Sequence, residues 1–366
     1  MSPLMNVPIN SPILGEEEET LVKEVLRSGQ LTSSSLKGGE MVRRFEEGLR
    51  DFIKAKDIVA VSSGTAALQI ALITLGIGVG DEVIVPSFTF VATANAILSV
   101  GAKPVFVDID EHYTIDPEDV IKKITNKTKA IIPVHLYGHV ANLEAILEIA
   151  NKRSLYVIED AAQALGSEYR GKMVGRWGDV GCLSFHPSKI ITTGEGGALI
   201  FEDEKLAEKA RMIRNHGMVK GYDSRIFGLN FRMSEIHAAI GIAQLKRLNE
   251  FLKRRRENAE KLRRLLTGIE EIKLPREREG CRYNWYLFTI SSSKRNEIKR
   301  ALEEEGIHAR IYYETPVHKL PSFNLNIDLP RTDIASKSVL SLPVHPKVNN
   351  VVLEKIAYTV RKALKA

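Results

Sequence analysis

The chain has few cysteines and tryptophans. The shortage of cysteine excludes a fold held together by disulfide bonds and one held together by cysteine-ligated metal ions. Among 366 residues there are two cysteines and two tryptophans. Cys182 and Cys281 stand far apart, so they provide neither a disulfide framework nor the spacing of metal ligands. Cys182 lies among apolar residues and is expected to be a small buried side chain. This cysteine content suggests a reducing cytoplasm, and we expect no bound metal.

Long apolar runs are also absent. No stretch approaches the roughly 18 consecutive apolar residues of a membrane-spanning helix. The first residues, MSPLMNVPINSPILGEEEE, lack the basic start and apolar centre of a signal peptide. We therefore expect a cytoplasmic protein without a membrane partner.

The charge excess is modest and is not concentrated in one patch. The formal net charge is +6, with acidic residues interspersed among basic ones. The densest basic run, residues 253–256, lies in a helical pattern and is followed by Glu257, which is typical of a solvated helix face. We expect no nucleic-acid partner, whereas a mild basic excess would suit an anionic small substrate such as a nucleotide diphosphate.

Strand and helix patterns alternate along most of the chain. Strands are predicted directly before Ser62 and at 83–85, 104–107, 130–134 and 198–201, and helices at 16–27, 40–53, 142–150 and 205–215. This rhythm predicts an α/β fold with a mostly parallel sheet and helices on both faces. Ligands of such sheets bind at the carboxyl ends of the strands, where SSGT, PSFTF, HLYG, Asp160 and Ser184 are expected.

The C-terminal third predicts a second, smaller α/β domain. A long helix over residues 234–266, broken near Asn249, would lead to it. Strands are predicted at 285–291 and 309–313, and helices at 294–305 and 350–364. We expect an N-terminal arm over residues 1–15, a large domain over 16–250, and a linking helix with the small domain over 251–366.

Two residues suggest chemistry at the strand ends. Lys189 lies in SFHPSK, directly before IITTGEGG, and Asp160 follows the apolar run LYVIE. A lysine in a suitable pocket can form Schiff bases, and an aspartate at a strand end can pair with a pyridinium nitrogen. Each residue alone is weak support, since most lysines are solvated and such an aspartate is often a turn or helix cap.

Two further segments could complete such a site. The Ser62-Ser63-Gly64-Thr65 turn opens a helix, so its N–H groups and the helix dipole suit a phosphate, although an ordinary N-cap is the better explanation of this turn taken alone. Phe88 in PSFTF stands where a ring could cover a planar cofactor, and packing in the core is an equal alternative.

With these residues assembled, the chain resembles the sugar-nucleotide aminotransferases of the DegT/StrS type, which are fold type I enzymes dependent on pyridoxal phosphate (PLP). Seven motifs occur in the family's order: SSGTAAL, PSFTF, PVHLYG, EDAAQALGS, SFHPSK with TTGEGG, RNHG, and GLNFRMSEIHAAIGIAQL. The resemblance spans nearly the whole chain, and seven ordered motifs are far more specific than any one.

The resemblance implies a role for each motif residue. Lys189 would bind PLP covalently, Asp160 would pair with the pyridinium nitrogen and Gln163 would bond the phenolic oxygen. Phe88 would stack on the ring. The phosphate would be held by the turn at Gly64, Thr65 and Ala66 and by Ser184, and Asn230 would reach the cofactor of a neighbouring subunit, which makes the active unit a homodimer. Arg232 would support that region or pair within the interface.

The implied reaction moves an amino group from an amino acid, most often glutamate, to a nucleotide-linked ketosugar. Lys189 argues against the family's dehydratases, which have histidine at that position. His186 could touch the sugar or serve packing equally well. Tyr312, Tyr313 and His318 match a stretch that shapes the sugar pocket, but Tyr312 replaces the usual histidine, which leaves the substrate open. We expect transfer at C4 of a 4-keto-6-deoxy sugar, with a 3-keto acceptor as an alternative.

Three other functions are alternatives to a sugar-nucleotide aminotransferase. A PLP lyase or dehydratase, or a PLP-binding regulatory protein, would share the fold. The Lys189, Asp160 and Gln163 set disfavours a site that has lost turnover. A dinucleotide-binding dehydrogenase is disfavoured because the first strand-helix turn lacks the glycine fingerprint.

Overall fold

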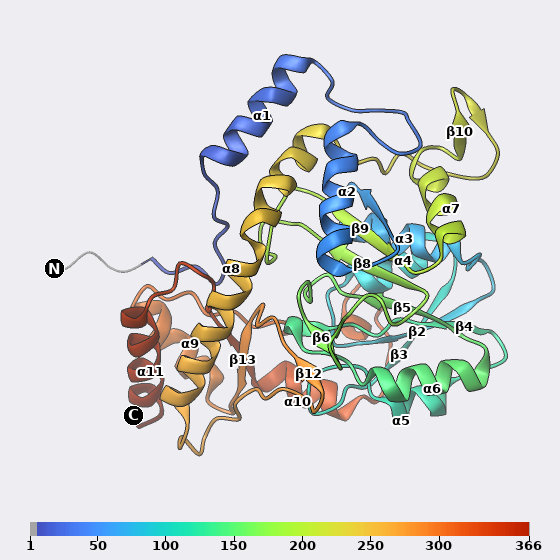
Figure 1. Ribbon diagram of the computed structural model, residues 1–366. Helices are drawn as coiled ribbons and strands as arrows, with labels where there is room; N and C mark the ends of the chain where they lie inside the picture. The colour runs from blue at the N-terminus through green and yellow to red at the C-terminus, as the bar shows by residue number, and fades with distance from the viewer. Residues whose placement is uncertain (1–5, 366) are drawn as a thin grey trace.

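The computed structural model describes residues 6–365, so the first five residues of the expected arm lie outside the described residues. A seven-stranded sheet forms the centre of the larger body (Figure 1). Its order is β1 (Asp57–Val61), β9 (Gly197–Phe201), β8 (Val180–Ser184), β5 (Tyr156–Asp160), β4 (Thr128–Ile131), β2 (Glu82–Pro86) and β3 (Lys103–Val107). Only β9 runs antiparallel to its neighbours. The prediction of a mostly parallel sheet is confirmed.

Helices cover both faces of this sheet because successive strand residues point to opposite sides. In β1, Val59 and Val61 join one apolar cluster, and Ile58 and Ala60 join another. The helices on the first face are α3 (Gly64–Thr74), α4 (Ala92–Ser99) and α7 (Glu204–Arg214). Those on the second face are α2 (Glu40–Ile53), α5 (Pro117–Lys123), α6 (Leu143–Arg153) and the first half of α8 (Glu235–Leu266).

The long helix α8 (Glu235–Leu266) is continuous, so the expected break near Asn249 is wrong. Asn249 is exposed on the helix surface. Its low helix propensity lowers the stability of the helix by less than about 1 kcal/mol, which is too little to end it. The helix packs against α1 (Glu16–Ser28) and α2 at its start and against α11 (Asn350–Lys365) near its end. The expected domain boundary at residue 250 therefore falls inside a helix.

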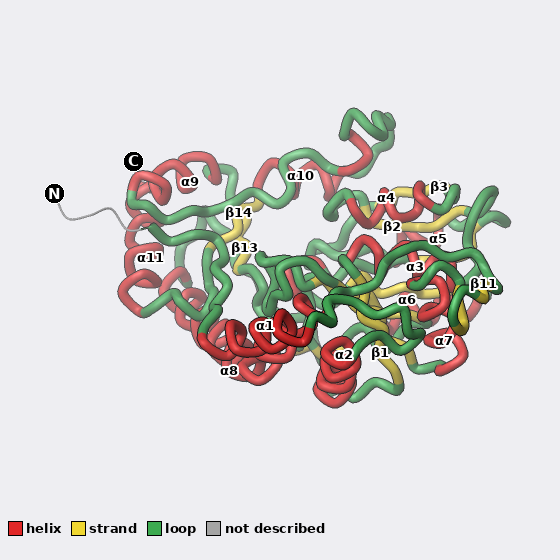
Figure 2. The backbone as a smooth tube through the Cα atoms, turned by 90° about the horizontal axis from the view of Figure 1, so that it is seen from above, coloured by secondary structure: helices red, strands yellow, loops and turns green. Residues whose placement is uncertain are grey.

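The small C-terminal body lies apart from the main sheet in the view from above (Figure 2). Its two-stranded sheet pairs β13 (Phe288–Ser291) with β14 (Val339–Leu342), flanked by α9 (Arg295–Glu304), α10 (Pro330–Ser338) and α11. The expected strand at 309–313 is wrong, because that segment makes only an isolated bridge between Arg310 and Ser341. The apolar pattern of ARIYY imitates a strand, but Tyr312 and Tyr313 line a cavity instead.

Short elements complete the described chain. One small sheet joins β12 (Cys281–Arg282), β6 (Glu168–Tyr169) and β7 (Lys172–Met173), and a hairpin joins β10 (Met218–Lys220) to β11 (Asp223–Ser224). Single turns of 3₁₀ helix lie at Leu136–Gly138 and Val317–Lys319. Within residues 6–365, none of the helices combines the length and the apolar character that a bilayer crossing requires.

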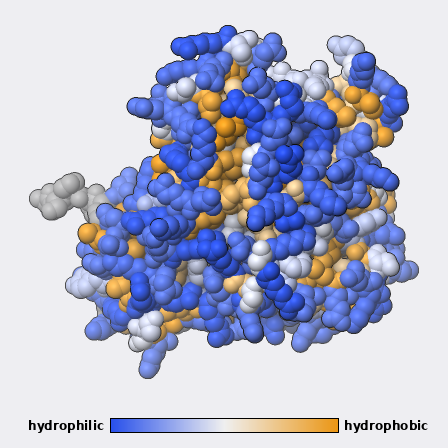
Figure 3. Space-filling view, in the orientation of Figure 1, coloured by the Kyte–Doolittle hydropathy of each residue, from blue (hydrophilic) through white to orange (hydrophobic). Residues whose placement is uncertain are grey.

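Most of the face seen in Figure 3 is hydrophilic. Apolar side chains gather in a column over the upper part of α8, between α1 and α2. Leu14, Leu26 and Leu31, in and beside α1, are among the exposed large apolar residues.

Gly197 at the start of β9 sets how closely the sheet approaches the turn before α3. A Cβ atom at Gly197 would lie 2.4 Å from the Ser63 carbonyl oxygen and 2.7 Å from the Gly64 nitrogen. We expect Gly197→Ala to lower the free energy of unfolding by about 1–3 kcal/mol, because backbone must move to relieve the clash. Urea denaturation measures this. Gly78→Ala is the control, since its Cβ would meet the Val100 carbonyl oxygen at an ordinary 3.5 Å; equal losses in both variants would contradict the prediction.

Candidate active site

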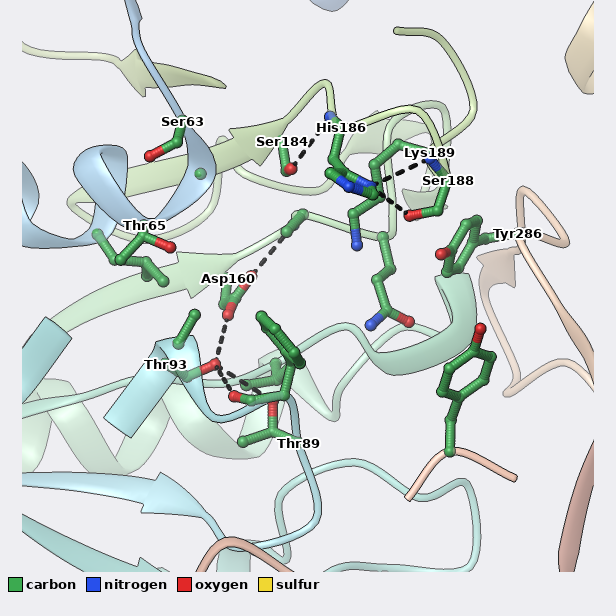
Figure 4. A pocket seen from close by; sticks show the side chains of 18 of the residues that line it. Ser63, Thr65, Thr89, Thr93, Asp160, Ser184, His186, Ser188, Lys189 and Tyr286 are labelled. Atoms are coloured by element: carbon green, nitrogen blue, oxygen red, sulfur yellow. Dashed lines mark hydrogen bonds between the residues drawn. The ribbon is translucent and has the colours of Figure 1, made fainter. Parts of the chain in front are cut away.

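A cavity of about 300 Å³ opens at the carboxyl ends of the central strands (Figure 4). The two bodies both contribute to it, since the sheet supplies most of the wall and the small body supplies tyrosines. Its volume is at the lower end of the range of small-molecule sites. The lining includes Ser63, Gly64, Thr65, Thr89, Phe90, Thr93, Asp160, Gln163, Ser184, His186, Ser188, Lys189, Glu195, Tyr286, Tyr312 and Tyr313.

Lys189 and Asp160 reach into this cavity from neighbouring strand ends (Figure 4). Lys189 lies in the loop after β8, and its Nζ is 5.2 Å from the centroid of the Tyr286 ring. Asp160 ends β5 and is 6% exposed. The Thr93 hydroxyl donates to Asp160 Oδ2 at 2.8 Å, and the Ala162 N–H donates to Oδ1 at 3.2 Å.

The electrostatics of Asp160 favour a cationic partner inside the cavity. Burial raises the pKa of this carboxyl group, and the Thr93 hydroxyl, the Ala162 N–H and the charge of Lys189 only partly oppose that rise. A cation placed beside the carboxylate would offset the desolvation and keep it ionised.

Glu159, the residue before Asp160, was missed by the sequence reasoning. It points to the other face of β5 and is fully buried. Its carboxylate accepts N–H groups from Gly175, Trp177 and Gly178 at 2.6–2.8 Å and faces His135 Nε2 at 3.0 Å. Burial alone would raise the pKa of Glu159, but His135 and these N–H donors bring it below its usual value. Glu159 thus fixes the strand end that presents Asp160.

The turn before α3 forms one end of the cavity, as Figure 4 shows for Ser63 and Thr65. A Cβ at Gly64 would lie 2.8 Å from the Ser184 Cβ, so only glycine allows this close approach. Ser63 caps the helix, and its hydroxyl accepts the Ala66 N–H at 3.1 Å. The Ala66 N–H is therefore already bonded. Ser63 belongs to the turn that the sequence indicated but was not itself assigned to the phosphate, and it lines the cavity together with Gly64, Thr65 and Ser184.

The aromatic wall requires a correction. Phe88 has no exposed surface and packs near Tyr113 and Tyr313, with ring centroids 6.3 Å apart in each pair. A ring without exposed surface cannot cover a ligand in the cavity, so the assignment to Phe88 is wrong. Phe90, two residues later, is 54% exposed and lines the cavity.

Gln163 and two tyrosines form the wall opposite the helix turn. The Tyr137 N–H donates to Gln163 Oε1 at 2.7 Å, which leaves the amide nitrogen directed away from the backbone. That nitrogen is 3.5 Å from the Tyr313 hydroxyl. Burial raises the pKa of Tyr313, so its phenol stays protonated and able to donate a hydrogen bond. Tyr312 also lines the cavity.

The other proposed site residues divide into two groups. His186 is exposed, lines the cavity and has its Nδ1 3.0 Å from the Ser188 hydroxyl. His318 has no exposed surface, and its Nδ1 lies 2.6 Å from the Ser87 hydroxyl. His318 therefore supports the loop that carries Phe90, and its assignment to the substrate pocket is wrong for this conformation.

Asn230 and Arg232 lie outside the cavity lining. Asn230 is exposed on the segment after the β10–β11 hairpin. Arg232 donates to the Asn215 side chain of its own chain at 2.8 Å. Its expected role at a subunit interface stays a prediction.

The described groups fit PLP. A helix N-terminus suits its phosphate, a buried carboxylate suits its ring nitrogen, and a lysine within the same cavity suits its aldehyde. The described residues hold no group of three or more histidine, cysteine, aspartate or glutamate side chains arranged for a metal ion. The fold and the cavity are those of a PLP-dependent transaminase.

Comparison with known proteins agrees. A sequence profile of the DegT/DnrJ/EryC1/StrS aminotransferase family matches residues 12–361. The chain is 41% identical to a "Pleiotropic regulatory protein" of Geobacillus stearothermophilus, covering 96% of this chain and 98% of the relative. It is 42% identical to a UDP-N-acetyl-3-dehydro-alpha-D-glucosamine 3-aminotransferase of Acidithiobacillus ferrooxidans, covering 84% of each.

Solved structures give the same result. The crystal structure of DesV from S. venezuelae, in complex with a ketimine intermediate, superposes with a TM-score of 0.92 at 37% identity, covering 96% of this chain and 95% of DesV. The chain belongs to the DegT/DnrJ/EryC1/StrS aminotransferase family. The expectation of a fold type I transferase is confirmed.

The Thr93 hydroxyl stabilises the ionised form of Asp160, so its loss must raise the pKa of this carboxyl group further. The carboxylate of Thr93→Val would then take up a proton at higher pH, and the acidic limit of PLP binding would move upward. A hydrogen bond to a charged group contributes about 1.5–3 kcal/mol, which corresponds to a shift of about one to two pH units. Thr93→Ser keeps the hydroxyl and is the control. A limit that stays in place in Thr93→Val would refute the role of Thr93.

Substitution of the two phenylalanines of PSFTF should have different effects, one on PLP affinity and the other on stability. We expect Phe90→Leu to weaken PLP binding about two- to tenfold, because a stacked aromatic pair contributes about 0.5–1.5 kcal/mol beyond its buried area. Phe88→Leu should leave PLP affinity unchanged and lower stability by about 1 kcal/mol, as core substitutions of similar volume do. Fluorescence titration with PLP and thermal unfolding measure the two effects, and the reverse pattern would restore Phe88 to the cofactor wall.

Proposed function

We propose that this protein uses PLP to transfer an amino group from glutamate to a nucleotide-linked ketosugar. The observation that carries the proposal is the placement of Lys189, Asp160 and the turn before α3 around one cavity. These three groups match the aldehyde, the ring nitrogen and the phosphate of PLP. Family membership and the printed activity of the Acidithiobacillus relative support the nucleotide-sugar acceptor.

Each side chain has a task in this proposal. Asp160 would accept a hydrogen bond from the protonated ring nitrogen of PLP, and its burial would shield that ion pair from water. Gln163 would donate its amide nitrogen to the phenolic oxygen of PLP. Thr65 and Ser184, with N–H groups at the start of α3, would hold the phosphate. Phe90 would pack against the ring.

PLP supplies an electron sink for the carbanion that forms at the amino acid's Cα. Lys189 Nζ would move the proton, first as a base that takes it from Cα of the donor and then as an acid that returns it during the same half-reaction. Tyr286 beside Lys189 Nζ restricts where the ammonium group can move. Two half-reactions at one site predict ping-pong kinetics.

The acceptor carbon is the finer part of the proposal. We infer a 4-keto-6-deoxy sugar from the motif resemblance, with His186, Tyr312 and Tyr313 at the sugar end of the cavity. A 3-keto acceptor is the second candidate, favoured by the printed name of the Acidithiobacillus relative. Product analysis by NMR after incubation with each class of ketosugar distinguishes them.

We further infer a homodimer with shared active sites. Asn230 is exposed outside the cavity of its own chain, as a residue that reaches a neighbour's cofactor must be. Tyr222 and Phe227, on the same segment, are 99% and 66% exposed and could be covered by a second copy. Complementation between Lys189→Ala and Asn230→Ala subunits tests the sharing.

The test of function is the absorbance spectrum of the PLP-loaded protein before and after glutamate. We expect a long-wavelength band of lysine-bound PLP that glutamate converts to the shorter-wavelength band of the pyridoxamine form, with release of 2-oxoglutarate. Lys189→Ala should lose the first band. A wild-type band that glutamate leaves unchanged would contradict transamination from this donor and favour a lyase or a PLP-binding regulatory protein, as the name of the Geobacillus relative allows.

A further inference from the structure

The N-terminal arm reaches the back of the Lys189 loop. Val7 bridges to Ile307 of the small body, and the Pro8 carbonyl accepts from His345 Nε2 at 3.0 Å. The Ile13 carbonyl accepts from Gln244 and Arg247 of α8 at 2.8 and 2.7 Å. The arm is thus tied at both ends, and Asn10 lies between these attachments.

Asn10 joins the arm to the catalytic loop and to α8. Its Nδ2 donates to the Ser188 carbonyl and, at 3.3 Å, to the Lys189 carbonyl. Its Oδ1 accepts from Arg255 Nη2 at 2.6 Å. Arginine only donates and carbonyl groups only accept, so the orientation of the Asn10 amide is unambiguous.

Arg255 is unusual because it is a buried cation without an anion. Its exposure is 2%, and none of the ion pairs among residues 6–365 includes it. Burial lowers its pKa to about 10, so it remains charged near neutral pH. Its other contact is Nη1 to the Tyr286 carbonyl at 3.0 Å, which fixes the residue whose ring faces Lys189.

The burial of the Arg255 guanidinium is not explained by a bound ligand. The space beside Arg255, lined also by Lys189 and Ile13, has a volume of about 10 Å³, which is too small for an amino acid carboxylate. The position of the guanidinium is explained by what it holds: the Asn10 amide on one side and the Tyr286 backbone on the other.

We propose that Asn10 and Arg255 are positioning residues for Lys189, so that the N-terminal arm is a working part of the active site. Arg255 orients the Asn10 amide and the Tyr286 backbone, and Asn10 holds the two carbonyl groups that frame Lys189. The Schiff-base lysine therefore has a fixed backbone below it and a fixed ring beside it. This inference rests on the proposed function, in which Lys189 binds PLP.

Asn10→Asp is the decisive variant because it separates two tasks of the same side chain. An aspartate keeps the size of asparagine and still accepts from Arg255, now as an ion pair, so the arm stays attached. It cannot donate to the Ser188 and Lys189 carbonyls, and its charge repels them. Asn10→Ala removes both tasks, and Lys347→Ala is the matched control. That control breaks only an exposed arm contact, Lys347 Nζ to the Ser11 hydroxyl at 3.1 Å.

The measurements are thermal unfolding, the visible circular dichroism per bound PLP, and the single-turnover rate of the glutamate half-reaction. Visible dichroism reports how rigidly the lysine-bound cofactor is oriented, which a purely structural role would not change. We expect Asn10→Asp to unfold within about 3 °C of wild type, the shift that about 1 kcal/mol produces in a large domain. It should lose most of the dichroism, and its half-reaction should slow about 10- to 100-fold, as misplacement by about 1 Å does. Lys347→Ala should match wild type in dichroism and rate.

The outcomes distinguish this inference from the proposed function. If wild type forms the band and reacts with glutamate but Asn10→Asp and Asn10→Ala retain the dichroism and the rate, the positioning role is wrong and the function stands. The positioning role is also wrong if Lys347→Ala loses as much dichroism and rate as Asn10→Asp. Any loss of an arm contact would then have the same effect, and the Asn10 amide would have no specific role. If wild type forms no band with PLP, the proposed function is wrong, and the positioning role that rests on it is wrong as well.

Discussion

The active site depends on one physical constraint: the carboxyl group of Asp160 is buried beside the cavity, where burial disfavours its ionised form and a neighbouring cation favours it. The carboxylate ends β5 at the centre of the sheet, almost out of reach of water. Burial raises the pKa of Asp160, whereas the Thr93 hydroxyl, the Ala162 N–H and the charge of Lys189 lower it by less. In the proposed function, the protonated pyridine ring of PLP would be the neighbouring cation, and the ion pair would keep the ring able to withdraw electrons. Under this proposal, the cofactor's chemistry and the electrostatics of Asp160 would depend on the same ion pair.

Much of the structure around Asp160 serves to hold its position. Glu159 anchors the other face of the strand end through three backbone N–H groups and His135. Gly64 and Gly197 let the helix turn approach β8 and β9 closely enough to face the same cavity. His318 and Ser87 fasten the loop that carries Phe90. These residues need not touch a ligand, yet each fixes a group that faces the cavity.

The sequence predicted what depends on local periodicity and ordered motifs. The alternation of strands and helices gave the parallel sheet, and the motifs led to Lys189, Asp160 and Gln163, which the structure brings to one cavity. The assignment of Phe88 to the cofactor ring failed because Phe88 and Phe90 both follow β2 in an irregular loop, where strand alternation no longer indicates which ring faces the cavity. The supposed strand at 309–313 failed because tyrosines that line a cavity imitate an apolar strand pattern. No local pattern could link Asn10 to Arg255, since they are 245 positions apart.

Lys189 is the residue proposed to bind PLP covalently. Loading the protein with PLP, reducing it with borohydride and locating the modified residue by peptide mass spectrometry would identify the lysine. We expect a phosphopyridoxyl group on the peptide that contains Lys189 and on no other peptide in stoichiometric amount. Modification mainly at another lysine, or no stable modification of the loaded protein, would contradict it.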